Sequence, residues 1–416
     1  MTDMYLNVVD LRLVLLVLVA LVALVALLLQ YVLRLRRFTL VNKYASWQQE
    51  AQAVEAATHE AKGGGAGFVS IIIPVNERCA SCAGSLVESL FKQKCDVDYE
   101  IILADEGHSE CVRDLVERGQ KSFGSLRYTF VPETARYIEV RKLAITLGVK
   151  AARGEWVLIL DAQTLPLNDE WLHHFVQNLS EESDMVQAYY NYEDNGTWVA
   201  RRAILDEVDH FVQKVAAWDK GVTLDCGCTN WAMRKSAFMA QHGFADSVSL
   251  PFGEEAILAN LHVGADRLSI LCAADTRTIL ALPHKTAISN MRVQRNELIH
   301  HLTNGARKFF VQNGVSSAML YVMVASVVCY VGLRLFGDLT ANSYSLGYLY
   351  TDALCMIVLV AAFVLPFVFV RKTLKTLSER RYGAYIYLYY LLRPFHTLAT
   401  SCVRWENKGS FVRKFI

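Results

Sequence analysis

The stretch Gly154-Glu155-Trp156-Val157-Leu158-Ile159-Leu160-Asp161-Ala162-Gln163-Thr164-Leu165-Pro166 runs from one turn through a block of apolar residues into a second, polar turn. A short apolar block between turn residues is typical of a buried strand in a parallel sheet. Two similar blocks precede it, at 68–74 and 99–104, and the later one also leads into an aspartate, Asp105. Open α/β sheets bind ligands just beyond the carboxyl ends of their strands. Asp105 and Asp161 are therefore the first candidate site residues.

The segments around these strands alternate between strand and helix patterns. We predict strands at 68–74, 99–104, 126–131 and 156–160, and helices at 80–93, 109–119 and 138–152. Repeated strand–helix units predict one α/β domain with a mainly parallel sheet, over residues 68–312. The first strand is not followed by Gly-x-Gly-x-x-Gly, and the chain has no Gly-Lys-Ser/Thr sequence, which disfavours a dinucleotide-dependent dehydrogenase and a phosphate-binding loop.

Three long apolar segments lie outside this domain, at 13–33, 319–336 and 354–370. A bilayer requires about 20 apolar residues in a helix, so we predict an N-terminal transmembrane anchor within residues 1–37 and two transmembrane helices within 317–371. A signal peptide, the alternative for the first segment, would have an apolar centre of only about 7–15 residues.

Positive charges follow the first and the third segments. They are Arg34, Arg36 and Arg37 after the first, and Arg371, Lys372, Lys375, Arg380 and Arg381 after the third. Excess positive charge marks the cytoplasmic side of a membrane, so residues 34–317 and the chain after 371 are expected in the cytoplasm. Arg334 lies near the end of the second segment, and we expect its side chain to extend toward the headgroups. We see no paired charges within the three segments, which disfavours a transporter.

The remaining regions are a linker and a tail. Residues 38–67 are expected to form a polar helix at 43–61 followed by a Gly-rich break, and residues 372–416 a basic, aromatic tail at the membrane interface. The net charge of +1 disfavours a nucleic-acid-binding face. The cysteines of a cytoplasmic domain are expected to be reduced. The spacing of Cys226 and Cys228 is poor for zinc.

Polar residues after the first, second and fourth strands could bind a nucleotide. Pro74 and Glu77 form a turn after the first strand, and Asp105 and Glu106 could hydrogen-bond a base or a ribose hydroxyl. The alternative for these acids is a helix capped by Ser109 with solvated carboxylates. Mg²⁺ or Mn²⁺ on a nucleotide diphosphate takes one or two carboxylates, and Asp161, two residues before Gln163, could supply one.

Later segments offer further candidates. Gly227 would let the backbone approach a ligand closely, and Asn230 adds a hydrogen-bond donor. Glu254 and Glu255 begin an apolar helix, where one could accept a proton from a hydroxyl nucleophile or simply stabilise the helix dipole. Arg295 could balance the charge of a leaving diphosphate. The alternative is that Arg295, like Arg292, Arg307 and Lys308, contacts anionic lipid headgroups.

Taken in order, these segments resemble the membrane-bound family 2 glycosyltransferases with a GT-A fold. The matching segments are Ser70–Glu77 for the opening strand and turn, Glu100–Gly107 for "VDDGS", Arg141–Gly148 for "gKa.AlN.G", Asp161–Gln163 for D-x-D, Gly227–Phe238 for "G.N.a.rk..F", Gly253–Glu255 for "GED", and Gln294–Arg295 for the start of "QRxRW". The resemblance covers about residues 68–298.

The resemblance implies transfer of a sugar from a nucleotide sugar to a hydroxyl acceptor, with inversion, in bacterial surface-polysaccharide or glycolipid synthesis at the inner membrane. It implies donor binding by Pro74, Glu77, Asp105, Glu106, Lys142 and Asp161, and Mg²⁺ or Mn²⁺ at Asp161 and Gln163. The catalytic residues would be Glu255 and Glu254. Acceptor or diphosphate contacts would come from Gly227, Asn230, Gln294 and Arg295. The implied partners are a lipid-linked or glycan acceptor, the membrane, and subunits of a polysaccharide assembly.

The chain departs from the family pattern at four places. Gln163 replaces the second acid of D-x-D, Glu255 replaces an Asp, Thr146 replaces an Asn, and Glu297-Leu298 replaces the final Arg-Trp. Glutamine removes charge from a site for a hard cation, and the longer Glu255 can shift a catalytic base by about 1 Å. These departures motivate a second hypothesis, a catalytically degenerate partner that binds a nucleotide or organises a membrane assembly.

Overall fold

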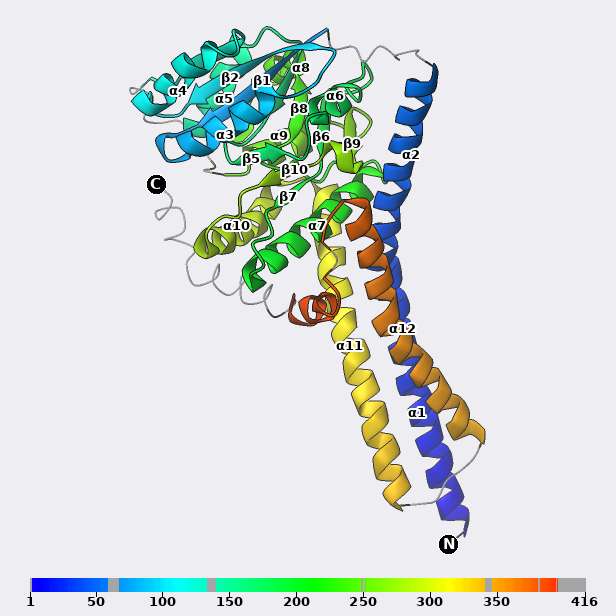
Figure 1. The fold of residues 1–416 in the computed structure, drawn as a ribbon. Coiled ribbons are helices and arrows are strands. Elements are labelled where there is room, and N and C mark those ends of the chain that lie inside the picture. Colours follow the sequence, from blue (N-terminus) through cyan, green and yellow to red (C-terminus); the bar gives the residue numbers. More distant parts are fainter. Residues whose placement is uncertain are drawn as a thin grey trace. The chain divides into compact units, whose positions relative to one another are not determined.

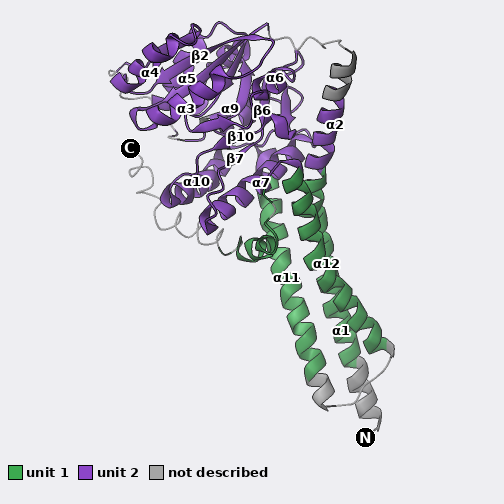
Figure 2. Cartoon of the chain, viewed as in Figure 1, with its two compact units in different colours: residues 1–39, 308–375, 380–397 green, residues 40–307, 376–379, 398–416 purple. Residues whose placement is uncertain are grey.

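The computed structural model describes residues 2–58, 67–132, 140–247, 250, 252–340, 346–380, 382–393 and 395 (Figure 1). The chain divides into two compact units (Figure 2). Unit 1 comprises Met1–Thr39, Lys308–Lys375 and Arg380–Thr397, and unit 2 comprises Leu40–Arg307, Thr376–Glu379 and Leu398–Ile416. The predicted Gly-rich break lies almost entirely outside the described residues, as does most of the predicted tail.

Unit 2 contains a seven-stranded sheet. Its spatial order is β3 (Leu126–Phe130), β2 (Asp98–Asp105), β1 (Phe68–Val75), β4 (Trp156–Ile159), β8 (Trp231–Arg234), β6 (Met185–Ala188) and β9 (Leu268–Leu271). The first four strands are parallel, β8 is antiparallel to both of its neighbours, and β6 and β9 are parallel. The predicted mainly parallel α/β sheet is therefore confirmed. The antiparallel strand β8 was not predicted.

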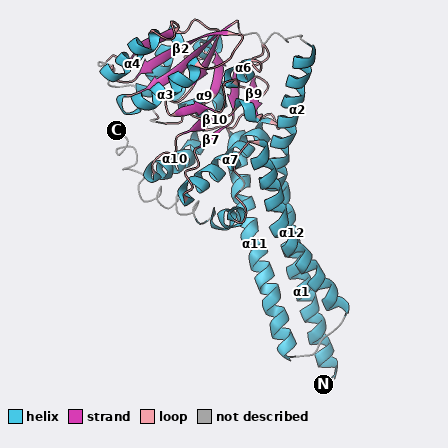
Figure 3. Ribbon diagram, viewed as in Figure 1, coloured by secondary structure: helices cyan, strands magenta, loops and turns pink. Residues whose placement is uncertain are grey.

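Helices cover both faces of this sheet (Figure 3). On one face, alternate residues of β1 such as Ile71 and Ile73 share a buried core with α3 (Ala80–Phe91), α4 (Glu110–Gln120) and α6 (Trp171–Val176). On the other face lies α5 (Val140–Ala151), whose Gly148 is so close to Ile72 that a Cβ there would lie 2.6 Å from Ile72 Cγ2. Because β1 lies between β2 and β4, the connections leave it in both directions, and this is the point in an open sheet where ligands bind.

Unit 2 also contains a second, smaller sheet and further helices. A three-stranded sheet has the order β5 (Thr164–Pro166), β10 (Thr278–Leu280) and β7 (Tyr190–Tyr192). The remaining helices are α7 (Trp198–Trp218), α8 (Lys235–Ala240), α9 (Glu254–His262) and α10 (Lys285–Leu298), with short 3₁₀ turns at Glu77–Cys79, Ala245–Ser247, Ala274–Thr276 and Ile299–His301. The segment Thr376–Glu379 also belongs to this unit, because Arg277 pairs with Glu379 at 2.8 Å and donates to the carbonyls of Leu377 and Ser378.

Unit 1 is built from long apolar helices. They are α1 (Thr2–Gln30) and most of α11 (Asn304–Thr340) and α12 (Leu346–Thr376). A π-helical turn at Tyr31–Leu35 joins α1 to α2 (Arg36–Thr58), a polar helix whose residues from Leu40 onward belong to unit 2. Among the residues that the structure describes, three helical stretches are long and apolar enough to cross a membrane: Leu11–Ala51, Asn304–Leu335 and Gly347–Thr376. Residues 385–393 are also helical. One N-terminal and two C-terminal candidate spans were predicted, and this number is confirmed.

Arg334 has a specific partner within unit 1. Its Nε lies 3.3 Å from both carboxylate oxygens of Asp352, which also accepts a hydrogen bond of 2.6 Å from the Tyr330 hydroxyl. The prediction that the three segments carry no paired charges was wrong, because Arg334 of α11 pairs with Asp352, which lies within α12. An acid on the neighbouring helix neutralises the arginine, so the charge has a partner inside the helical bundle.

Candidate functional site

Apart from Lys142, which lies on α5 (Val140–Ala151), the predicted donor-binding residues lie where β1, β2 and β4 end. Asp105 is fully buried, and its Oδ1 accepts a hydrogen bond of 2.9 Å from Gly107 N. Its Oδ2 accepts from Ser109 N and, at 3.0 Å, from the Tyr128 hydroxyl. Burial raises the pKa of Tyr128, and the Asp105 carboxylate adds to that effect. Asp105 therefore shapes the turn that carries its neighbour Glu106.

Glu106 is less buried and lies beside the turn after β1. Its Oε2 accepts a hydrogen bond of 3.3 Å from the Asn76 side chain, and its backbone N donates to the Val75 carbonyl at 2.9 Å. Of the two other predicted donor contacts in this turn, Pro74 is buried and Glu77 is exposed. Glu106 and Glu77 are thus the acids of these two turns that a nucleoside could reach.

Asp161 follows β4 and is held by backbone and side-chain contacts. Its N donates to Thr229 Oγ1 at 2.9 Å, and its Oδ1 accepts from Gln163 N at 3.0 Å. The Gln163 side-chain amide lies 3.4 Å from Cys79 Sγ. Burial, and then the charge of Asp161, raise the pKa of the Cys79 thiol. Asp161 and Gln163 are thus linked through the backbone of the turn, while the Gln163 side chain lies against Cys79.

Arg141 joins Asp161 to Glu255. Its Nη1 lies 3.2 Å from Asp161 Oδ2, and its Nη2 lies 3.6 Å from Glu255 Oε1 and donates to the Cys228 carbonyl at 3.3 Å. Glu255 is buried in the first turn of α9, with 4% of the residue exposed. One guanidinium therefore connects the acid after β4 with the acid at the start of α9.

Two contacts fix the loop that leads to Glu255. Gly253 has a left-handed φ of +72°, and a Cβ there would lie 2.7 Å from Leu298 Cδ1 of α10. Lys142, buried in α5, donates its ammonium to the carbonyls of Ser247 and Leu250. Both the positive φ of Gly253 and its close packing against Leu298 require glycine at position 253. Lys142 thus braces this loop from inside the protein, and Leu298 occupies the space beside Gly253.

The loop after α7 brings Gly227 and Cys228 close to Tyr190. A Cβ at Gly227 would lie 2.2 Å from Tyr190 Cε1, so a protein side chain makes the close approach that Gly227 permits. The Cys228 thiol lies 3.9 Å from the Tyr190 hydroxyl. Burial raises the pKa of this thiol to about 12, and the carboxylates of Asp161 and Glu255 add to the effect. Cys228 therefore lies within electrostatic reach of both acids.

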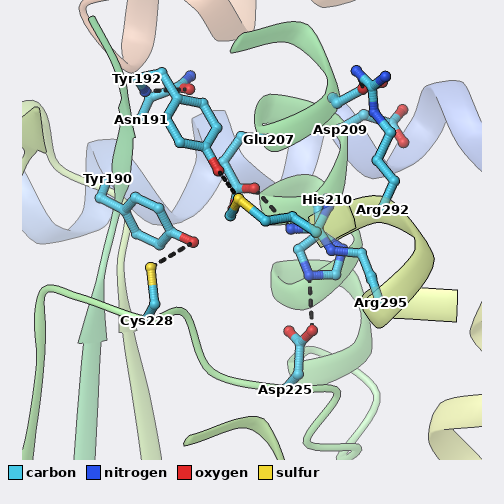
Figure 4. Close-up of polar contacts among 12 residues, drawn as sticks. Tyr190, Asn191, Tyr192, Glu207, Asp209, His210, Asp225, Cys228, Arg292 and Arg295 are labelled. Carbon is cyan, nitrogen blue, oxygen red and sulfur yellow. Dashed lines mark hydrogen bonds and ion pairs between the residues drawn. The ribbon is translucent and has the colours of Figure 1, made fainter. Parts of the chain in front are cut away.

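Arg295 reaches from α10 to an acid of α7 (Figure 4). Its Nη2 lies 2.9 Å from Glu207 Oε2. Burial alone would raise the pKa of Glu207, but the charge of Arg295 lowers it. Arg292 makes the equivalent contact to Asp206. Arg295 thus belongs to a buried ionic network within unit 2, and Gln294 next to it is half-buried on α10.

The same network anchors the loop that carries Gly227. Asp225 at the start of the loop accepts a hydrogen bond of 2.8 Å from His210 Nε2, and its other oxygen lies 3.3 Å from Lys214 Nζ. Burial lowers the pKa of His210, and the charge of Arg295 lowers it further. Burial alone would raise the pKa of Asp225, but His210 and Lys214 lower it well below its usual range. The loop is therefore fixed by charges from α7.

Asn230 closes the loop from the inside. It is fully buried with a left-handed φ of +61°, and its side-chain amide donates to the carbonyls of Tyr189 and Thr276. Glu254 begins α9 one residue before Glu255. The structure thus gathers Asp161, Glu255 and the Cys228 carbonyl around Arg141, with Gln163 and Gly227 next to these residues in sequence. Asn230 and Lys142 make backbone contacts that brace the surrounding loops.

Comparison with known proteins identifies the family of this domain. Residues 70–240 match the family described as Glycosyl transferase family 2. Residues 70–240 therefore form a glycosyl transferase family 2 domain.

Among curated relatives of the family 2 domain, chondroitin synthase from Escherichia coli is 30% identical over 119 residues, which is 28% of this chain and 16% of that protein. Among solved structures, the mannosyltransferase PcManGT from Pyrobaculum calidifontis, in complex with GDP-Man and Mn²⁺, has a TM-score of 0.45 at 16% identity, over 79% of this chain and 99% of that one. Glucosyl-3-phosphoglycerate synthase from Mycobacterium tuberculosis, in complex with Mn²⁺, UDP and glucosyl-3-phosphoglycerate, has a TM-score of 0.38 at 15% identity, over 56% and 80% of the two chains.

The residues at the tip of β4 fit a divalent cation that arrives with a diphosphate. Among the described residues, no three His, Cys, Asp or Glu side chains lie together as a metal site. Mg²⁺ commonly binds through one or two carboxylates and takes its other ligands from phosphate and water. Asp161 supplies one carboxylate, and the side-chain oxygen of Gln163 is of the right chemical type.

Several residues around the family 2 site were not predicted from the sequence. Arg141 lies next to Lys142, and the resemblance implied donor binding by Lys142 rather than by Arg141. Tyr190 and Glu207 lie in segments that match no motif of the family. The signal that could have identified Arg141 is its place at the start of the segment that resembles "gKa.AlN.G". Glu207 gave no such signal, because its partner Arg295 lies 88 positions away along the chain.

Proposed function

We propose that this chain is a membrane-bound glycosyltransferase that moves a sugar from a nucleotide-sugar donor to a hydroxyl acceptor with inversion. The observation that carries the proposal is the cluster in which Arg141 connects Asp161 and Glu255. These groups lie at the switch point of the sheet, where an open α/β fold binds its ligand. Asp161 offers a carboxylate to a metal cation, the Arg141 guanidinium offers positive charge to a phosphate, and Glu255 offers a second carboxylate that can accept a proton.

The chemistry assigned to Glu255 is general base catalysis. The acceptor hydroxyl oxygen attacks the anomeric carbon, and the bond from that carbon to the diphosphate oxygen breaks and leaves its electron pair on the diphosphate. Glu255 takes the hydroxyl proton as the new bond forms. Because attack and departure occur on opposite faces in a single displacement, the anomeric configuration inverts. Glu254, the neighbouring acid, remains a second candidate for this role.

The donor is assigned to the turns after β1, β2 and β4. Because the oxygens of Asp105 already accept hydrogen bonds from the backbone of their own turn and from Tyr128 of β3, Glu106 is the better candidate for the ribose or base contact, with Glu77 in the turn after β1 as a second acid. Asp161, with the side-chain oxygen of Gln163, would hold a Mg²⁺ or Mn²⁺ ion. That ion would neutralise charge on the diphosphate. Arg295 and Gln294 are assigned to the acceptor or diphosphate side.

The three apolar helical stretches support a membrane location. The positive residues that follow the apolar segments 13–33 and 354–370 support a cytoplasmic site for the family 2 domain, at the inner membrane of a bacterium. An acceptor at that face would be a lipid-linked sugar or a growing glycan, and the product would enter a surface polysaccharide or glycolipid. Partner subunits of a polysaccharide assembly are part of the same proposal.

The test is release of nucleotide diphosphate by the detergent-solubilised full chain, with a panel of UDP- and GDP-sugars, Mg²⁺ or Mn²⁺, and membrane acceptors. We expect release with one donor, its loss in Asp161→Ala, and normal release in the control Asp169→Ala, whose side chain is exposed. Release that persists in Asp161→Ala would contradict the donor-site assignment. Absence of release from every donor, together with retained nucleotide binding, would favour a degenerate partner. The departures Gln163 and Glu297 motivate that second candidate.

A further inference from the structure

Arg141 lies at the centre of the candidate active site, where it contacts two acids and a backbone carbonyl. It pairs with Asp161 at 3.2 Å and with Glu255 at 3.6 Å, and it donates to the Cys228 carbonyl. Its own side chain is 22% exposed, against 20% for Asp161 and 5% for Glu255. The guanidinium therefore lies between a buried acid and an acid that is more accessible to solvent.

The two oxygens of Asp161 have different partners. Oδ1 accepts the backbone hydrogen bond from Gln163 N, which holds the turn. Oδ2 faces Arg141. A divalent cation that bound Asp161 through Oδ2 would therefore lie close to the guanidinium, which already occupies one side of that oxygen. A guanidinium and a divalent cation are alternative counter-ions for one carboxylate oxygen, and they repel each other at short range.

We propose that Arg141 is an internal counter-ion that competes with a divalent cation for Asp161 Oδ2 and turns to the donor diphosphate when it is displaced. Arg141 would thereby be a positioning residue for Glu255, because the same guanidinium holds that carboxylate before the donor binds. This inference rests on the proposed function of the site. The planar guanidinium offers paired donors that suit phosphate oxygens as well as carboxylates, so the exchange of partners conserves its hydrogen bonding.

The proposal predicts effects of opposite sign on two ligands. In Arg141→Gln, Mn²⁺ added alone should bind more tightly, by about fivefold, because the competing charge is gone. In the same variant, UDP or GDP measured in EDTA should bind about tenfold more weakly, because the nucleotide loses a charge-assisted contact to its diphosphate. A purely structural arginine would weaken both ligands together, through damage to the loop.

The experiment uses the full chain in detergent, with Mn²⁺ binding followed by electron paramagnetic resonance and nucleotide binding by calorimetry. Arg141→Lys keeps the charge and should leave the Mn²⁺ affinity close to that of the unmodified chain, even if Arg141→Gln folds poorly. Arg153→Gln is the matched control, because Arg153 is 72% exposed and lies 4.0 Å from a different acid, Glu100. Its affinities for both ligands should not change.

The outcomes separate this inference from the function on which it rests. Tighter Mn²⁺ binding with weaker nucleotide binding in Arg141→Gln supports the competition, and so does loss of the Mn²⁺ difference when Asp161→Asn is added. Unchanged or weaker Mn²⁺ binding in Arg141→Gln overturns it. If the unmodified chain binds neither UDP nor GDP, the proposed function fails, and the Mn²⁺ comparison alone decides whether Arg141 competes with a cation.

Discussion

Substitution of Gly227 by alanine tests the packing that holds the site loop. The added Cβ would lie 2.2 Å from Tyr190 Cε1, 3.0 Å from Cζ and 3.1 Å from the hydroxyl oxygen. Carbon atoms in contact are normally about 3.5–4.0 Å apart, so either the buried ring or the loop has to move by about 1 Å or more. Overpacking of this kind costs about 1–3 kcal/mol of the free energy of unfolding. For a unit of this size, a loss of about 2 kcal/mol lowers the melting temperature by about 4–8 °C.

The assay is thermal unfolding of the detergent-solubilised full chain, followed by tryptophan fluorescence. Gly124→Ala is the control, because a Cβ at Gly124 meets nothing within 4 Å and its melting temperature should not change. A smaller residue opposite should relieve the clash, so Gly227→Ala combined with Tyr190→Leu should be less destabilised than the sum of the two single variants. Equal melting temperatures for Gly227→Ala and the control would refute the packing described here.

Three other variants address separate parts of the chain. In Lys142→Met, the carbonyls of Ser247 and Leu250 lose their buried hydrogen-bond donor, at a cost of about 1–3 kcal/mol each. The melting temperature should therefore fall, and proteolysis before α9 should become faster. An unchanged melting temperature and an unchanged rate of proteolysis would contradict the bracing role of Lys142. Burial lowers the pKa of His210 in the folded chain below the value of about 6.5 that a histidine has when unfolded. As the pH falls from 7 to 5, the unfolded chain therefore takes up a proton at His210 before the folded chain does, and the free energy of unfolding should decrease. The melting temperature of His210→Gln should depend less on pH over that range, and an identical dependence would count against a buried neutral histidine. Arg334→Met should destabilise the helical unit in detergent, and Arg334→Asp combined with Asp352→Arg should be more stable than either single charge reversal if the two side chains form the observed pair.

The sheet could be predicted because its strands are buried on both faces. A strand covered by helices on both sides has a continuous apolar run, and the runs at 68–74 and 156–160 match β1 and β4 closely. The three long helices could be predicted equally directly from their apolar segments, because a helix that crosses a bilayer needs an uninterrupted run of apolar residues. Asp161 could be placed for the same reason, since the end of a strand in an open sheet locates the ligand.

Arg141 and Lys142 show what the sequence does not reveal. A step of one residue turns an α-helix by about 100°, so these neighbours in the first turn of α5 face different surroundings. Lys142 reaches the carbonyls before α9, whereas Arg141 faces Asp161. Which of the two faces the site depends on how the helix is rotated against the sheet, and that rotation follows from tertiary packing.

The buried charges of α7 could not be found for a related reason. A helix with Glu207, His210 and Lys214 resembles a solvated face when it is viewed alone. Their partners Asp225 and Arg295 come from a loop and from a distant helix. Antiparallel strand β8 and the small second sheet depend on similar long-range pairings, which local apolar periodicity does not encode.

The role of Glu255 as the base in sugar transfer is tested most directly by Glu255→Gln, with donor binding and transfer measured on the same preparation. This variant keeps the size of the side chain but removes its ability to take a proton. The account predicts that the nucleotide-sugar dissociation constant stays within about threefold, because the donor is held by other residues, while transfer to the acceptor falls by about 100-fold or more. Transfer at the original rate, or loss of donor binding in parallel with transfer, would contradict the assignment of Glu255 as the base.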